Sequence, residues 1–273
     1  MLNLIKMDFY RLFRSKAVRV GAFASVLFAL FVSILNLGIV EIVKFATAED
    51  PSAAAGMGEF FSVVSWIGGV DFADIVLTGT GMLSLFLACI IAASYIGAEQ
   101  SCGYLKNIAG QLPNRGYLIV SKFVATCFIQ FMVLAIYTAV CSICAGLFFG
   151  NYITSYSIGA LAGGLALRFL LFCAMDAILL LFCTLTKSHA IAMVFGAIFG
   201  IGVTSLVYMA VSGLLSMVNI KLDLARIMPD GINGLIRVDS LGDVAVRAVV
   251  VSVIFIAVSL TSAAILFKKR DVK

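Results

Sequence analysis

A short polar segment between two long apolar runs carries the first candidates for chemistry. It extends from Glu99 to Lys122 and also contains Lys106 and Arg115. His189 is the only histidine, so the two-histidine zinc site of the HExxH motif is excluded. The sequence also lacks the GxxxxGK(S/T) loop that holds nucleotide phosphates. We therefore expect no ATPase site, no cofactor and no metal in this chain.

One acid lies inside an apolar stretch. Asp176 falls near the middle of residues 158–186. A carboxylate at mid-membrane costs on the order of 2.5–3.5 kcal/mol on insertion scales, so we expect it to face protein or water. Two interpretations remain open: the acid lines a substrate path, or it is a protonated or hydrogen-bonded acid between helices. Arg168 lies near the outer edge of the same stretch, and we expect its side chain to extend to the membrane surface.

The cysteines offer little specific chemistry. Of the seven in the chain, only Cys102 lies outside the apolar runs, in the polar segment. Cys141 and Cys144 form a CxxC pair, but no second pair or nearby histidine completes a metal site. We interpret the cysteines in the apolar runs as small apolar side chains.

The composition indicates an integral membrane protein. Of the 273 residues, 63% are hydrophobic and 12% are charged, whereas a soluble domain carries about 25% charged residues. At this chain length a soluble core could not hide so much apolar surface. The net charge of +5 is compatible with nucleic-acid binding, but the basic residues cluster beside apolar runs, where they act as topology signals. We therefore expect a lipid bilayer, and no nucleic acid, as a partner.

Six apolar runs are long enough to cross a hydrocarbon core of about 30 Å. Before them, residues 1–19 place apolar side chains on one helical face and most basic ones opposite, which is typical of a helix lying in the membrane interface. We therefore predict an all-α integral membrane fold with one transmembrane domain over residues 1–273. The predicted spans are residues 20–40, 75–97, 123–149, 158–186, 191–215 and 244–267.

Glycine pairs at four-residue spacing allow close packing between such helices. These pairs are Gly146/Gly150, Gly159/Gly163 and Gly196/Gly200.

The distribution of Lys and Arg predicts the orientation. One side of the predicted membrane domain carries 13 of these residues and the other carries four. The positive-inside rule then places both termini and the polar segment in the cytoplasm of a multi-pass plasma-membrane protein. At the start of this segment, residues 98–110 put apolar side chains on one helical face and polar ones, including Glu99 and Lys106, on the other. Such a short helix suits docking into a groove of a partner protein, while an interfacial loop without a partner remains the alternative.

The polar segment follows the pattern Glu99-x-x-x-Gly103-x-Leu105-Lys106, then Pro113-x-Arg115 and Ser121-Lys122 at the start of the third span. This pattern resembles the type-2 ABC transporter permease family, and the layout of the whole chain is similar to its small bacterial members that serve bacteriocin- and bacitracin-type export or immunity. In that family the segment between spans two and three is a coupling helix that contacts a separate ATPase subunit. The resemblance therefore places Glu99, Gly103, Lys106 and Arg115 at or near such a contact. Tyr104 departs from the pattern, because the family often has threonine there.

The resemblance implies a membrane-spanning permease subunit of an ATP-driven ABC exporter for a peptide, a drug or a lipid-like molecule. Six spans make half of a pathway, so it also implies a second permease subunit in a homo- or heterodimer. Two alternatives stay open. The chain could be an ion-coupled secondary transporter that uses Asp176, or a membrane immunity or scaffold protein that transports nothing.

Overall fold

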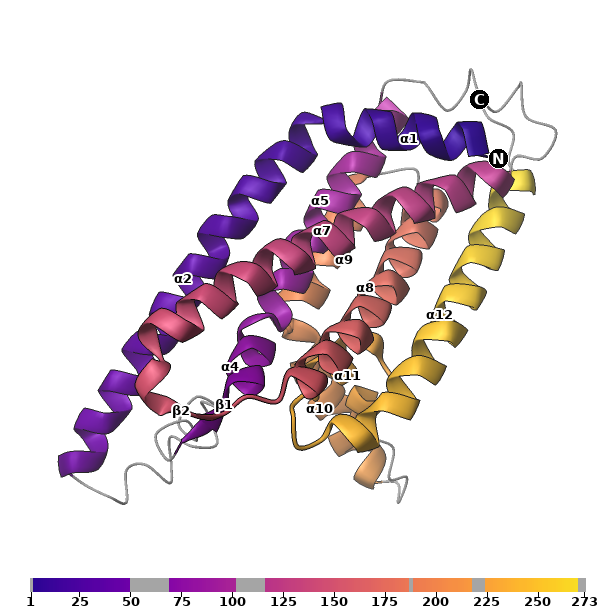
Figure 1. Cartoon of the computed structure of the whole chain (residues 1–273). Helices are drawn as coiled ribbons and strands as arrows, with labels where there is room; N and C mark the ends of the chain where they lie inside the picture. Colours follow the sequence, from indigo (N-terminus) through magenta and orange to yellow (C-terminus); the bar gives the residue numbers. More distant parts are fainter. Residues whose placement is uncertain (1, 50–68, 102–115, 187–188, 218–223, 270–273) are drawn as a thin grey trace.

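The computed structural model describes residues 2–49, 69–101, 116–186, 189–217 and 224–269, and nearly all of them are helical (Figure 1). The five longest helices are α2 (Lys16–Glu49), α5 (Met82–Ser101), α7 (Gly116–Phe148), α8 (Ile158–Thr186) and α12 (Leu241–Lys269). The shorter helices are α1 (Leu2–Arg14), α4 (Phe72–Gly79), α9 (His189–Ile201), α10 (Val203–Met217) and α11 (Pro229–Gly234). The 3-10 turns η2 (Gly150–Tyr152) and η3 (Leu224–Arg226) and the short parallel strands β1 (Val70–Asp71) and β2 (Ile153–Ser155) complete the described elements.

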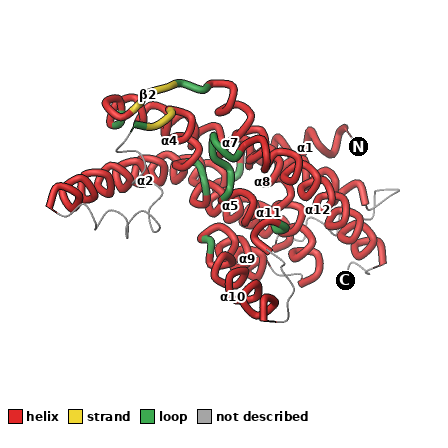
Figure 2. The backbone as a smooth tube through the Cα atoms, turned by 90° about the horizontal axis from the view of Figure 1, so that it is seen from below, coloured by secondary structure: helices red, strands yellow, loops and turns green. Residues whose placement is uncertain are grey.

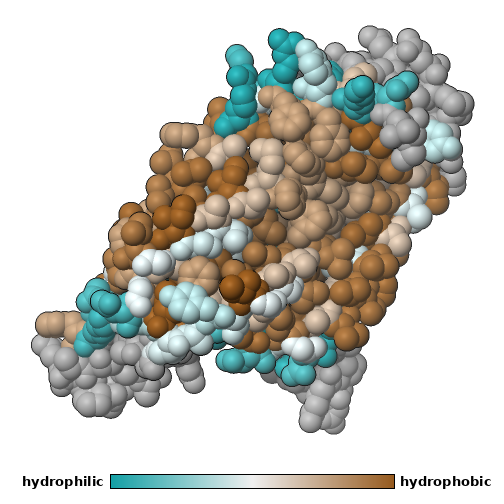
Figure 3. Space-filling model, viewed as in Figure 1, coloured by the Kyte–Doolittle hydropathy of each residue, from teal (hydrophilic) through white to brown (hydrophobic). Residues whose placement is uncertain are grey.

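The predicted all-α integral membrane fold is confirmed. Within the described residues, five stretches are long and apolar enough to cross a membrane: Lys16–Ile42, Phe72–Gly97, Gly116–Phe148, Ile158–Thr186 and Leu241–Phe267. Figure 3 shows the matching surface, with a hydrophobic flank between two ends that carry the hydrophilic side chains. The apolar flank is where lipid tails can replace water around the helices.

A bent pair of helices takes the place of the fifth predicted span, residues 191–215. Met193–Gly200 of α9 and Val203–Leu215 of α10 meet at an angle of 72°. Gly202, between them, has a φ of 80°, a conformation that glycine adopts without the steric cost of a side chain. The sequence prediction counted only apolar length, which is the same for a straight and for a bent helix. Figure 2 shows α9 and α10 at one edge of the bundle, next to α5.

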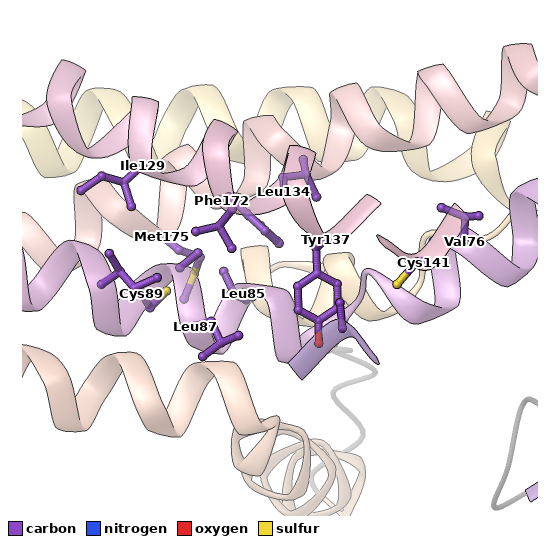
Figure 4. Packing of buried hydrophobic residues seen from close by; sticks show 14 of the residues in the cluster. Val76, Leu85, Leu87, Cys89, Ile129, Leu134, Tyr137, Cys141, Phe172 and Met175 are labelled. Carbon is purple, nitrogen blue, oxygen red and sulfur yellow. The ribbon is translucent and has the colours of Figure 1, made fainter. Parts of the chain in front are cut away.

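Helices α4 and α5 together form the second span and supply the centre of the bundle. Helix α4 ends at Gly79 and α5 begins at Met82, so a short break interrupts the span. In the most apolar window of this span 71% of the residues are buried, against 17% for α12, which is therefore peripheral. Figure 4 shows side chains of this span, α7 and α8 converging in the core, among them Leu85, Tyr137 and Phe172. Cys89 and Cys141 lie in the same core as free thiols, in the role of small apolar side chains.

One of the three glycine pairs brings two helices into close contact. A Cβ atom on Gly200 would lie 2.2 Å from the Cα atom of Phe86, and one on Gly196 would lie 3.1 Å from the Cβ atom of Cys89. Helix α9 therefore packs directly on the backbone of α5, as the four-residue spacing predicts. A Cβ atom on Gly159 would meet no atom within 4 Å, so that glycine has no such role.

Helix α1 lies across one end of the bundle (Figure 1). It confirms the predicted N-terminal amphipathic helix, although it ends at Arg14 and α2 already begins at Lys16. Part of its apolar face packs on protein, because the rings of Phe9 and Phe13 lie 5.0 and 5.7 Å from the ring of Phe128 on α7. The helix is thus attached to the bundle as well as amphipathic.

Candidate functional site

A buried carboxylate attaches α1 to the rest of the molecule. Asp8 is fully buried, and its two oxygens accept hydrogen bonds from Ser121 Oγ at 2.5 Å and from Lys122 Nζ at 2.7 Å. The hydroxyl of Tyr95 on α5 donates to the backbone oxygen of Asp8 at 3.1 Å. Lys122 is itself only 4% exposed, so the two charges neutralise each other inside the protein.

The Asp8 contacts join α1 to the end of α5 and to the start of α7. Tyr95 lies near the end of α5, which stops at Ser101, and Lys122 lies near the start of α7, which begins at Gly116. Helix α1 therefore bridges the two helices that lead into and out of residues 102–115.

Asp176 lies in the contact between α7 and α8. Its side chain is 1% exposed, and Gln130 Nε2 of α7 donates to its Oδ1 at 2.6 Å. The acid therefore faces protein, as its cost in lipid requires. The hydrogen bond between helices is the observed state of this side chain, and a role in a substrate path stays a prediction.

Arg168 is buried, so the prediction that it extends to the membrane surface is wrong. The side chain is 2% exposed, and its Nη1 donates to the backbone oxygen of Leu77 and, at 2.6 Å, to Thr80 Oγ1. Its Nη2 lies 3.5 Å from the backbone oxygen of Asn233 on α11. Both carbonyls belong to the last turns of short helices, α4 and α11, where the helix dipole favours a cation. These acceptors hold the two terminal nitrogens of the guanidinium, while its Nε has no hydrogen-bond partner among the described residues.

The buried carboxylate of Asp230 fixes α11 from another side. Asp230 accepts hydrogen bonds from Thr204 Oγ1 at 2.5 Å and from the hydroxyl of Tyr208 at 2.7 Å, both on α10. Helix α11 is thus fixed to α8 through Arg168 and to α10 through Asp230. This network lies at the end of the bundle opposite α1 (Figure 1).

Asp71 organises the same end from outside the spans. Its carboxylate accepts from the backbone N–H groups of Ala73 and Ser157 at 2.7 and 3.1 Å, and from the hydroxyls of Ser155 and Ser157 at 2.7 and 2.6 Å. Burial alone would raise the pKa of Asp71, but the hydrogen bonds from Ser157, Ser155 and Ala73 outweigh it and lower the pKa to about 2. The ionised carboxylate caps α4 and ties it to the segment before α8.

Metal-binding side chains do not cluster in the part of the chain that the structure describes. No three His, Cys, Asp or Glu side chains there gather in a way that could hold a metal ion. The buried polar contacts described above instead join helices to one another.

Comparison with known proteins gives the family. A family model described as "ABC-2 family transporter protein" matches residues 4–203, which is most of the chain. The chain belongs to the ABC-2 transporter family. Comparison with curated proteins gives no match. The predicted relationship to type-2 ABC permeases is thereby confirmed, and the chain is a multi-pass membrane protein of the permease type.

The ABC-2 match extends from α1 to the bend between α9 and α10. It includes the α1 contact with α5 and α7 and the Asp176–Gln130 pair. Among the residues predicted to contact an ATPase, Glu99 lies in the last turn of α5. Gly103, Lys106 and Arg115 fall in residues 102–115, outside the described part of the chain. Their role in this ABC-2 permease stays a prediction.

Asp8 was not predicted from the sequence to be buried and paired with Lys122. Its one signal is that it is the only acid in the first 40 residues, at the flank of the apolar face of an otherwise basic helix. A lone acid in that place is more consistent with a buried cation as partner than with an exposed position. Its partners, 113 and 114 residues further along the chain, carry no signal that points back to it.

Proposed function

We propose that this ABC-2 permease is the membrane-spanning subunit of an ATP-driven exporter. The observation that carries the proposal is the family match over residues 4–203, together with the membrane-spanning helices that it covers. A separate ATP-binding subunit supplies the energy, since the sequence has no phosphate-binding loop of its own. The exported molecule is a peptide, a drug or a lipid-like compound, and the membrane is the cell membrane.

In this proposal residues 98–115 contact the ATPase, with Glu99, Gly103, Lys106 and Arg115 at the contact. Nucleotide-driven motion of the ATPase displaces this segment and, with it, the adjoining ends of α5 and α7. The Asp8 contacts favour a joint movement of the two helices, because α1 binds both. Coupling further requires that the ATPase bind this segment with different affinity in the inward and outward states.

The excess of Lys and Arg at the α1 end supports a cytoplasmic position for both termini and for residues 98–115.

A second permease subunit, either a copy of this chain or a similar protein, completes the pathway. The apolar, largely exposed faces of α2 and α12 are available to such a subunit and to lipid, since only 28% and 17% of their most apolar windows are buried within one protomer.

The test is reconstitution with the cognate ATPase, followed by co-purification and ATP-dependent transport. We expect Glu99→Ala and Lys106→Glu to reduce ATPase-coupled transport at least tenfold, and Lys106→Glu to weaken co-purification. Lys44→Glu is a matched charge reversal at the opposite end of the bundle and leaves both measurements unchanged. Complexes and transport that are unaffected by the first two changes would contradict the coupling role, and transport without any ATPase would favour an ion-coupled carrier.

We further propose that Asp176 contributes to the substrate path once α7 and α8 move apart. Asp176→Asn keeps the size of the side chain and its contact with Gln130, so a loss of transport at normal stability would support this role. A loss of stability without a change in the transport rate of the folded fraction would assign Asp176 to helix packing alone.

A further inference from the structure

The first two turns of α2 form an open hollow on the surface of the bundle. Its volume is about 390 Å³, and Lys16, Arg19, Val20 and Phe23 line it. Their spacing of three, four and seven residues puts them on one face of the helix. All four side chains are exposed, including Val20 and Phe23 at 67% each. An exposed apolar surface beside two cations is complementary to a molecule that has both a negatively charged group and an apolar group.

The charges around this hollow are one-sided. Arg19 Nη2 lies 3.5 Å from the backbone oxygen of Arg14, and Arg14 Nη1 donates to the hydroxyl of Tyr10 at 2.7 Å. Asp8 is the only acid in the first 40 residues, and it is buried against Lys122. Among the described residues, no ion pair joins Lys16 or Arg19 to a carboxylate.

The order of the side chains along α2 matches the order of groups in a phospholipid. Lys16 starts the helix, and Val20 and Phe23 lie about 6 and 10 Å further along its axis at 1.5 Å per residue. Figure 3 shows the same order on the surface, with hydrophilic side chains at the α1 end and a hydrophobic flank below them. Long basic side chains reach the headgroup level while their neighbours meet the acyl chains.

We propose that this hollow binds an anionic phospholipid at the α1 end of the bundle. Lys16 and Arg19 hold the headgroup phosphate, and Val20 and Phe23 contact the upper part of an acyl chain. A net negative lipid is preferred to a zwitterionic one, because a choline group would bring a further cation next to Lys16 and Arg19. The bound lipid fixes the corner between α1 and α2 at the level of the headgroups. This proposal does not depend on the transported substrate or on the ATPase.

The experiment places a fluorescent reporter in the hollow. Trp66 is the only tryptophan, so the full chain with Trp66→Phe and Phe23→Trp emits from this position alone. The protein is reconstituted in phosphatidylcholine vesicles that contain a minority of phosphatidylglycerol, with brominated acyl chains on one lipid or the other. We expect brominated phosphatidylglycerol to quench at a several-fold lower mole fraction than brominated phosphatidylcholine, and high salt to reduce the difference.

The basic side chains are then removed one at a time. Lys16→Gln and Arg19→Gln each reduce the preference for phosphatidylglycerol about fivefold, the factor that corresponds to about 1 kcal/mol per basic residue near an anionic surface. Lys44→Gln makes the same change of charge at the far end of α2 and leaves the preference unchanged. Circular dichroism and gel filtration check that each variant is folded.

Three results would overturn the proposal. Equal quenching by the two brominated lipids means that ordinary boundary lipid fills the hollow. Weak quenching by both means that a second copy or another protein covers it. Competition by free inorganic phosphate that abolishes the preference means that the site takes a soluble anion rather than a lipid.

Discussion

The buried pair of Asp8 and Lys122 makes the sharpest prediction. Asp8→Ala removes the carboxylate that accepts the hydrogen bond from the ammonium of Lys122, a side chain that is 4% exposed. The same change takes an acceptor from the hydroxyl of Ser121. We expect α1 to separate from α7 in a large fraction of the molecules, while the rest of the bundle stays folded.

The expected free-energy cost of Asp8→Ala follows from the burial of both Asp8 and Lys122. Removing one partner of a buried ion pair costs about 3–5 kcal/mol, because an uncompensated charge remains in a poorly hydrated site. This energy corresponds to a factor of about a hundred to a few thousand in the equilibrium for undocking α1. An exposed position on the same helix gives the reference: Lys6→Ala changes stability by no more than about 0.5 kcal/mol.

Amide hydrogen exchange of the protein in detergent micelles measures this equilibrium region by region. Protection in α1 falls by the stated factor in Asp8→Ala, protection at the start of α7 falls with it, and protection in α12 does not change. A double variant, Asp8→Leu with Lys122→Met, restores much of the protection, since replacing both charges by apolar side chains leaves no charge unpaired.

Unchanged protection of α1 in Asp8→Ala would refute the reasoning. The same conclusion would follow if Asp8→Leu and Lys122→Met had additive effects, because partners in a buried ion pair must be coupled.

Three further predictions concern the packing and the end opposite α1. Gly200→Ala destabilises the protein by about 1–3 kcal/mol in mixed-micelle unfolding, because the added Cβ would overlap the backbone of α5. Gly159→Ala is the control and carries no such overpacking cost, because a Cβ there meets no atom within 4 Å. Tyr208→Phe removes the donor to Oδ1 of Asp230 and lowers the free energy of unfolding by about 1–3 kcal/mol. Tyr156→Phe is the control and has no measurable effect on stability, because its ring is exposed. Asp71 has a pKa of about 2 in the folded protein against an ordinary 3.8, so its contribution to stability is complete above pH 4 and is lost as the pH falls towards 2. Asp71→Asn removes that pH dependence, and an acid titration of stability that is identical in wild type and variant would contradict the assignment.

The sequence alone determined the class of this protein and the order of its parts. Apolar length and the scarcity of charge are sums over neighbouring residues, so the spans near 20–40, 123–149, 158–186 and 244–267 could be predicted without any knowledge of packing. The N-terminal amphipathic helix followed from periodicity for the same reason. The pattern around Glu99 to Lys122 indicated the family, which the match over residues 4–203 confirms.

The tertiary structure decided what the polar side chains inside these spans do. Apolar length placed Arg168 at the membrane surface, but its acceptors come from α4 and α11, 91 and 65 residues away, and they hold its side chain within the protein. Asp8 looked like one polar residue of an interfacial helix, and only its contact with α7 shows that it is buried. The bend at Gly202 likewise depends on a backbone conformation that hydropathy does not record. In each case the outcome depends on which distant side chain or carbonyl lies opposite, and that is fixed by how the helices pack rather than by the residues next to it in the chain.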